Sequence, residues 1–227
     1  MAPSRRVLTS EVAVFLLLIV PSLVLSLFVI RQGQLSFVLA ATATIFRDVG
    51  LVCLILYFLW RNGEPVDRLG WTRRHMVREL AIGIVCFAPV FLGAALLERA
   101  LVRVGLSAPT TPLPSFLNDK GAAEALLATL LVTVVALAEE TIFRGYLLLR
   151  FQGILRSTTA SVLLSSAVFA LGHGYEGSAG VVTVGTMGAL FALVYLWRRS
   201  LVAPVVMHFL QDFLTIVLLP AFERFHS

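Results

Sequence analysis

The stretch Ala125–Arg144, ALLATLLVTVVALAEETIFR, decides the fold class and introduces the residues that the function must explain. Its first part, up to Ala138, carries no charge and is apolar enough to enter a bilayer as a helix, which needs about 20 residues to cross. The run then meets Glu139 and Glu140 directly, and Arg144 follows one turn later. Charged groups inside hydrocarbon are costly and rare, so we expect these three to have a functional reason.

The composition of the whole chain agrees with a membrane protein. Of the 227 residues, 59% are hydrophobic and only 14% are charged. Soluble domains average about 45–50% apolar and about 25% charged residues. This balance excludes intrinsic disorder and an ordinary nucleic-acid-binding protein, and the 2 cysteines exclude a small disulfide scaffold. We therefore predict an all-α, polytopic integral membrane protein whose first partner is the lipid bilayer.

Apolar runs along the sequence predict seven transmembrane helices. An eighth crossing results if Thr141–Leu155 forms a separate element. No internal repeat or linker divides the chain, so we expect one structural domain. The predicted spans are Val12–Ile30, Leu35–Trp60, Leu80–Leu97, Ala125–Ala138, Ser157–Gly172, Gly177–Trp197 and Ser200–Phe222.

The positions of the basic residues predict the orientation. With seven crossings and a cytoplasmic N-terminus, the basic residues of the inner loops outnumber those outside, as the positive-inside rule requires. The short chain with Arg-rich loops is interpreted as a protein of a bacterial cytoplasmic membrane. The inner set is Arg5, Arg6, Arg61, Arg68, Arg73, Arg74, Arg78, Arg150, Arg156, Arg198 and Arg199; the outer set is Arg31, Arg99, Arg103, Lys120 and Arg224.

The first polar cluster in the C-terminal half is EETIFR, from Glu139 to Arg144. Consecutive residues of an α-helix point about 100° apart, so Glu139 and Glu140 are not expected to face one small site. Glu140 and Arg144 share a face and are expected to form an ion pair. That division leaves Glu139 free to act as a general base or acid. The alternative is a purely structural Glu–Arg clamp.

Two further clusters contain histidine: FALGH from Phe169 to His173, and HFLQD from His208 to Asp212. His208 and Asp212 lie four residues apart on one helix face and can offer a proton donor and an acceptor, or two metal ligands. Charged and polar groups on three apolar helices are best accommodated in one shared, water-containing cavity. For the clusters to meet there, we expect one long, bent helix over about residues 123–155.

Two chemistries fit such a cavity, and both hydrolyse an amide. In the first, Glu139 and His173 activate a water molecule while His208 and Asp212 stabilise the oxyanion of the tetrahedral intermediate. In the second, Glu139, His173 and His208 bind zinc and leave a coordination position for water. The sequence leaves both open.

EExxxR, FxxxH and HxxxD, in this order on successive apolar helices, resemble the CPBP family of intramembrane proteases, which includes the CAAX prenyl endopeptidases and the bacterial Abi proteins. The resemblance covers roughly residues 125–219. It implies that residues 122–227 form a catalytic core of four helices and that residues 1–121 supply N-terminal transmembrane helices. It also implies a peptide or membrane-protein substrate.

Residue by residue, the resemblance implies a water-activating role for Glu139 with His173 as its partner. It also implies that His208 and Asp212 shape the oxyanion site. The supporting residues of the first two motifs are Glu140, Arg144 and Phe169. Many members of the family carry Asn where this chain has Asp212. An ionised Asp cannot donate a hydrogen bond to an oxyanion, so this residue stays protonated, orients His208 or contacts a metal.

Two other classes of function remain as alternatives. A catalytically silent membrane scaffold, with an immunity or regulatory role, would need no assembled Glu and His side chains. A small transporter would use the polar residues as an ion path, and the pair Arg47–Asp48 in the second apolar run suits that reading. However, the two halves show no matching pair of interrupted helices.

Overall fold

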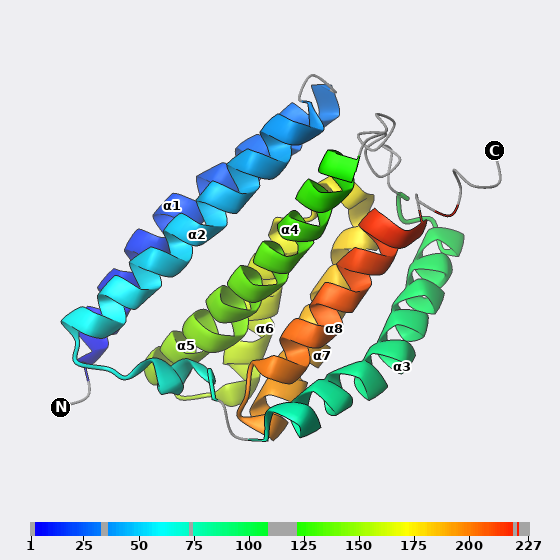
Figure 1. The fold of residues 1–227 in the computed structure, drawn as a ribbon. Helices are drawn as coiled ribbons and strands as arrows, with labels where there is room; N and C mark the ends of the chain where they lie inside the picture. The colour runs from blue at the N-terminus through cyan, green and yellow to red at the C-terminus, as the bar shows by residue number, and fades with distance from the viewer. Residues whose placement is uncertain (1–2, 33–35, 73–74, 109–121, 220–221, 223–227) are drawn as a thin grey trace.

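The computed structural model describes residues 3–32, 36–72, 75–108, 122–219 and 222, and within these ranges the chain is all-helical (Figure 1). Seven helical rods are formed, and two of them contain π-helical turns. The elements are α1 (Arg5–Gln32), α2 (Phe37–Arg61), η1 (Val66–Leu69), α3 (Met76–Arg103), α4 (Ala122–Glu139), η3 (Glu140–Leu147), α5 (Leu148–Leu155), α6 (Thr158–Leu171), η4 (Gly174–Glu176), α7 (Gly177–Arg198), α8 (Val202–Asp212) and η5 (Phe213–Leu218).

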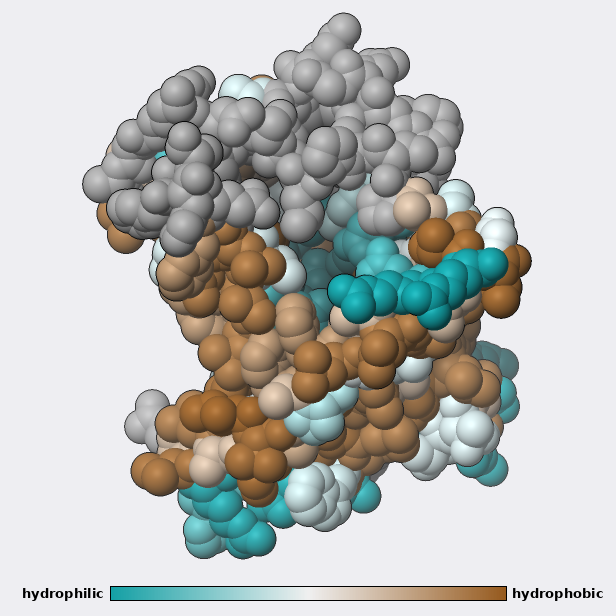
Figure 2. Space-filling model, turned by 90° about the vertical axis from the view of Figure 1, so that its right-hand side faces the viewer, coloured by the Kyte–Doolittle hydropathy of each residue, from teal (hydrophilic) through white to brown (hydrophobic). Residues whose placement is uncertain are grey.

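Four of the rods are long and apolar enough to cross a membrane. They are Phe37–Arg61, Met76–Arg103, Ala123–Leu155 and Gly174–Arg198, while Thr158–Leu171 and Val202–Leu218 are shorter apolar helices. Hydrophobic side chains cover most of the face that carries α3, and hydrophilic ones gather at its lower edge and in a hollow above (Figure 2). The chain is an integral membrane protein.

The rod α4–η3–α5 is continuous from Ala123 to Leu155, as the sequence predicted. Thr141–Leu155 is therefore not a separate element, and the alternative of an eighth crossing there is wrong. The π-helix η3 lies in the middle of this rod and widens its turn over Glu140–Leu147. Single π-helical stretches within α-helices are frequently found at functional sites.

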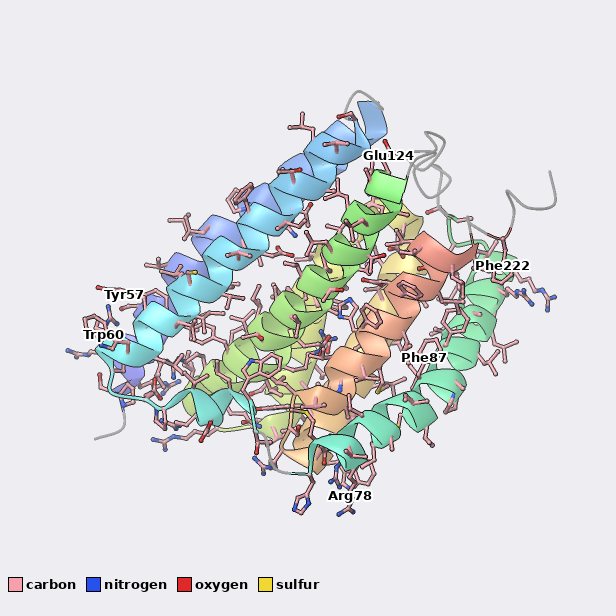
Figure 3. The ribbon with its side chains drawn as sticks, viewed as in Figure 1. Tyr57, Trp60, Arg78, Phe87, Glu124 and Phe222 are labelled. Atoms are coloured by element: carbon pink, nitrogen blue, oxygen red, sulfur yellow. The ribbon has the colours of Figure 1, made fainter. Side chains whose placement is uncertain are left out.

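The helices form a bundle in which α1 and α2 lie on one side, α3 lies on the other, and α4–α8 lie between them (Figure 1). Arg78 at the start of α3 and Glu124 at the start of α4 mark opposite ends of the bundle (Figure 3). Tyr57 and Trp60 lie near the end of α2, where aromatic side chains of membrane proteins often meet the interface. Successive rods therefore run in alternating directions, whereas the packed neighbours α2 and α4 run in the same direction, as do α3 and α8 (Figure 1).

The residues at which the helices begin and end place the three polar clusters at the same depth in the bundle. Glu139 precedes Leu155 by 16 residues and His173 follows Thr158 by 15, so each stands about 22–24 Å above the same end of the bundle at 1.5 Å per residue. The α8 helix begins deeper, beside Gly145 of η3: a Cβ atom on Gly145 would lie 3.3 Å from Cδ1 of Leu201, the residue that precedes α8. His208 thereby reaches the level of the other two clusters.

A buried ionic network fastens α1 and the loop after α2 to α5. Arg150 is 1% exposed and contacts Glu64 at 2.6 Å and Glu11 at 3.1 Å. Arg61 and Arg68 pair with the same two carboxylates from more exposed positions. Because the carboxylates come from outside residues 122–227, the N-terminal helices hold the lower end of the α4–η3–α5 rod in place.

Gly83 allows α3 and α8 to approach closely. A Cβ atom on Gly83 would lie 2.8 Å from the carbonyl oxygen of Ala203 and 2.7 Å from Cβ of Val206. We expect Gly83→Leu to lower the free energy of unfolding by about 1–3 kcal/mol or more, because overpacking forces backbone shifts. Thermal melting in detergent measures this effect. Gly93→Leu on the same helix is the control, because a Cβ there meets nothing within 4 Å; equal losses in both variants would contradict the close contact.

Candidate active site

The centre of the site is the carboxylate of Glu140, which holds two partners. Its Oε1 accepts from Nη1 of Arg144 at 2.7 Å and lies 2.8 Å from Nδ1 of His208. A carboxylate only accepts, so Nδ1 of His208 carries the hydrogen and Nε2 points away from Glu140. The predicted Glu140–Arg144 ion pair is confirmed, and both side chains are fully buried.

Arg144 is held on its other sides by aromatic rings and by the backbone of α7. Its guanidinium lies 4.3 Å from the ring centroid of Phe169 and 5.3 Å from that of Phe191. Nη2 donates to the carbonyl of Gly188 over 3.3 Å, and a Cβ on that glycine would press against Phe169 and Arg144. The position of Glu140, and through it that of His208, is therefore set by three helices.

Glu139 faces the opposite nitrogen of the same imidazole. Its Oε2 lies 3.8 Å from Nε2 of His208. That oxygen is buried and has no hydrogen-bond partner among the described residues. The expectation that Glu139 and Glu140 cannot face one small site is wrong. The chain passes from α-helix to π-helix between them, which reduces the angle between consecutive side chains, and the ring of His208 spans both.

Asp212 joins this group from one turn further along α8. Its Oδ2 lies 3.4 Å from Nε2 of His208, as their shared helix face predicted. Two carboxylates, Glu139 and Asp212, therefore approach the same nitrogen. This arrangement orients the imidazole and leaves carboxylate oxygens on the side away from Glu140.

His173 reaches the group indirectly, through Phe169. Its Nδ1 lies 3.0 Å from the backbone carbonyl of Phe169, and the two rings are 4.8 Å apart between centroids. The ring of Phe169 packs edge-on against His208 at 6.0 Å. His173 interacts electrostatically with His208 and Asp212. The contacts of the described side chains do not include one between His173 and Glu139.

The residues proposed from the sequence as zinc ligands do not form a ligand set. Zinc is normally held by three or four donors at about 2.0–2.3 Å around one point. Within the described ranges, no three His, Cys, Asp or Glu side chains are arranged to hold a metal ion. Glu139 and His208 face each other, whereas His173 contacts the backbone and the ring of Phe169.

Three residues near this site were not predicted from the sequence to belong to it. Arg47 and Asp48 of α2 interact electrostatically with Glu139, and Asp48 also with His208. Tyr175, two residues after His173, interacts with Glu139 and Asp212. A charged pair in the middle of an apolar run was a visible signal for the first two. Nothing in the sequence distinguished Tyr175 from any other loop tyrosine.

Comparison with known proteins identifies a family for part of this chain. Residues 121–214 match the model of the family described as type II CAAX prenyl endopeptidase Rce1-like. This segment belongs to the Rce1-like family. No curated protein and no solved structure matches the chain. The family is one of peptidases, which implies a protein or peptide substrate.

The Rce1-like segment contains all seven residues that the sequence analysis proposed for the site. The resemblance of the sequence to the CPBP family, which includes the CAAX prenyl endopeptidases, is confirmed. It begins just before α4 and ends within η5, so it includes every helix that contributes to the contacts of His208. The helices α1, α2 and α3 lie outside it. Arg47 and Asp48 are thus additions to the site from a part of the chain that the Rce1-like match does not cover.

Proposed function

We propose that the chain is an intramembrane endopeptidase that hydrolyses a peptide bond of a membrane-associated protein or peptide through a water activated by Glu139. One observation carries this proposal. Of two consecutive glutamates, Glu140 is fully buried and is held through Oε1 by Arg144 and His208, and its Oε2 has no hydrogen-bond partner among the described residues. The side chain of Glu139 is 14% exposed, and the hydrogen bonds of the described residues include none to either of its oxygens, so its carboxylate is not committed to a protein donor. A buried, unpaired carboxylate oxygen is an acceptor for the proton of water.

In the proposed reaction, Glu139 accepts a proton as the water oxygen attacks the scissile carbonyl carbon. The carbonyl oxygen becomes an oxyanion in the tetrahedral intermediate. Glu139 then returns the proton to the amine nitrogen, the C–N bond breaks, and a carboxylic acid and an amine are released; the acid then gives its remaining proton to the amine or to water and becomes a carboxylate. A positioned general base contributes about 10²–10⁴-fold to such a rate.

His208 and Asp212 are proposed to act on the oxyanion side. Glu140 fixes Nδ1 of His208, so Nε2 is held in a defined direction next to Glu139. In the imidazolium form Nε2–H donates, and it then stabilises the developing negative charge. Asp212 orients the ring from 3.4 Å. Of the three roles open for Asp212 from the sequence, orientation of His208 is the one this contact supports.

His173 is proposed to assist with the water. A backbone carbonyl only accepts, so Nδ1 of His173 donates to Phe169 and Nε2 of the neutral ring is an acceptor. The ring of Phe169 packs against both imidazoles and so helps to set their mutual position. The assignment of Glu140, Arg144 and Phe169 as supporting residues follows from these contacts.

The same proposal extends to topology. Residues 122–227 would carry the catalytic core and residues 1–121 would support it, with seven crossings in all. The ends of α2, α5 and α7 then lie on the cytoplasmic side with their arginines, as the positive-inside rule favours. The N-terminus would be cytoplasmic, and the membrane would be the bacterial cytoplasmic membrane.

Asp212 provides a test of its own role. We expect Asp212→Asn to keep turnover within about tenfold of wild type, because Asn retains an oxygen that accepts from His208 and adds a donor. Asp212→Leu should lose about 10²-fold or more, since it removes the group that orients the ring. Initial rates on a peptide that the wild-type protein cleaves measure both. If the Asn variant is as inactive as the Leu variant, the negative charge itself is required.

Genetic complementation distinguishes the proposed peptidase from a catalytically silent scaffold. Cells deleted for the gene receive wild type, Glu139→Gln or the matched Glu124→Gln, which changes a glutamate on the same helix outside the site. If the protein acts as a peptidase, Glu139→Gln fails to restore the wild-type phenotype and Glu124→Gln restores it, when both variants are present in the membrane in equal amounts. Restoration by Glu139→Gln would establish the scaffold function instead.

A further inference from the structure

The charged pair Arg47–Asp48 in the middle of α2 lies beside the proposed site and has no part in the mechanism above. Nε of Arg47 donates to Oδ1 of Asp48 over 2.8 Å. The Asp48 side chain is 2% exposed and that of Arg47 is 28% exposed. Because the Rce1-like segment begins at residue 121, membership of that family does not explain the pair.

The packing of α2 against α4 places the pair next to Glu139. The helices run side by side in the same direction (Figure 1), and Ala41 of α2 packs in one cluster with Ala128 of α4. Two turns further along each helix, about 10.5 Å, lie Asp48 and Val135. Glu139 is one more turn along α4. Electrostatic interaction of Asp48 with Glu139 and His208 agrees with this register.

The pair retains both kinds of hydrogen-bonding group without a protein partner within the described part of the chain. Arg47 uses Nε for Asp48, and its hydrogen bonds to the described residues do not involve the two terminal nitrogens. Oδ2 of Asp48 is buried and has no hydrogen-bond partner in the same part of the chain. The pair therefore combines N–H donors with a carboxylate acceptor, and its net charge is zero.

A peptide group is the ligand that matches this combination. It has one N–H and one C=O, and in hydrocarbon each unpaired backbone group costs several kcal/mol. A substrate segment that is opened for attack at its carbonyl carbon has lost the hydrogen bonds of a helix, so its backbone needs new partners. An anionic group would fit less well, because it would meet Asp48 as well as Arg47.

We propose that Arg47 and Asp48 form a substrate-binding subsite that holds one backbone peptide group beside the scissile bond, with Arg47 donating to its C=O and Asp48 accepting from its N–H. The inference rests on the proposed endopeptidase function. It gives α2 a direct part in substrate recognition. The competing explanation is a structural pair that only joins α2 to α4, and this explanation predicts a change in stability but no dependence on the backbone of the substrate.

A backbone-ester scan separates the two explanations. The probe is a synthetic peptide covering the segment whose cleavage in cells depends on Glu139, made in all-amide form and with a single ester in place of each amide near the cut. An ester keeps the carbonyl and removes the N–H. The proteins, in lipid nanodiscs, are wild type, Asp48→Ala, the double variant Arg47→Met/Asp48→Ala and the control Val49→Ala, whose side chain is an exposed neighbour on α2.

With wild type and Val49→Ala, we expect one ester position to raise KM about tenfold with kcat nearly unchanged, which is the loss of about 1.4 kcal/mol of binding. With Asp48→Ala, the all-amide peptide should already show the raised KM, and the same ester should cause no further change. The double variant leaves no unpaired charge in the bundle, so it should repeat this result even if Asp48→Ala folds poorly.

The subsite is overturned if the ester raises KM equally in wild type and in both Asp48 variants, or if these variants lower only the melting temperature. Failure of the proposed function looks different. In that case neither cells nor nanodiscs give cleavage that Glu139→Gln abolishes, and the subsite falls together with the peptidase.

Discussion

Replacing Glu139 by Gln should abolish peptide cleavage while leaving the protein folded. Gln keeps the size of the side chain, but its amide cannot take a proton from water. Turnover should therefore fall by about 10²–10⁴-fold, the usual contribution of a general base. Because Oε2 of Glu139 makes no hydrogen bond to the described residues, the change breaks no hydrogen bond at that oxygen and alters only its 3.8 Å approach to Nε2 of His208. We expect the loss in kcat, measured on a peptide that the wild-type protein cleaves, with little change in KM.

Two controls keep this result interpretable. Thermal melting should be equal to that of wild type, because the neutral amide avoids burying a charge. Glu140→Gln should behave differently, since it weakens the contacts to Arg144 and His208 and so affects melting as well as turnover. If Glu139→Gln retains wild-type kcat while Glu140→Gln does not, the two glutamates have been assigned to the wrong roles.

Replacing Arg144 by Met should give the largest loss of stability. The guanidinium is 1% exposed and neutralises Glu140, which is fully buried. Removing one partner of a buried ion pair leaves an uncompensated charge and costs about 3–5 kcal/mol in unfolding free energy. Contacts to the rings of Phe169 and Phe191 are lost as well. Thermal melting and resistance to proteolysis in detergent measure the effect.

The double variant Glu140→Gln/Arg144→Met tests the cause of that loss. It removes both charges and keeps an acceptor oxygen for His208, so we expect it to melt well above Arg144→Met alone. The comparison pair is Arg198 with Glu79, which joins α7 to α3; Glu79 is buried, but the arginine side chain is 14% exposed and so more hydrated than that of Arg144. Arg198→Met should cost less than Arg144→Met. If both arginine variants melt at the same temperature, burial of the Glu140–Arg144 pair is not what stabilises this part of the fold.

The features that depend on local patterns could be predicted from the sequence. Long apolar runs fixed the class of protein, and spacing of four residues predicted the contacts of Glu140 with Arg144 and of His208 with Asp212. The continuous rod over residues 123–155 was predicted from the need for the three clusters with Glu139, His173 and His208 to meet. The same reasoning named the residues that surround His208.

The features that depend on geometry between helices could not be predicted. The π-helical turns of η3 bring Glu139 and Glu140 to the same imidazole, that of His208. No pattern of residues in the sequence predicts these wider helical turns. The contact of His173 with Phe169 depends on how α6 packs against the rod. Arg47 belongs beside Glu139 only because α2 runs next to α4, and this contact joins residues far apart in the sequence.

The most direct test of the central claim is a survey of protein N-termini in membrane and secreted fractions. Cells carrying wild type are compared with cells carrying Glu139→Gln at equal protein level. We expect new N-termini within or beside apolar segments of other proteins. These termini should be present in cells with the wild-type protein and absent in cells with the variant. Identical sets of termini, in cells where the wild-type protein is needed for a measurable phenotype, would contradict a peptidase function for this site.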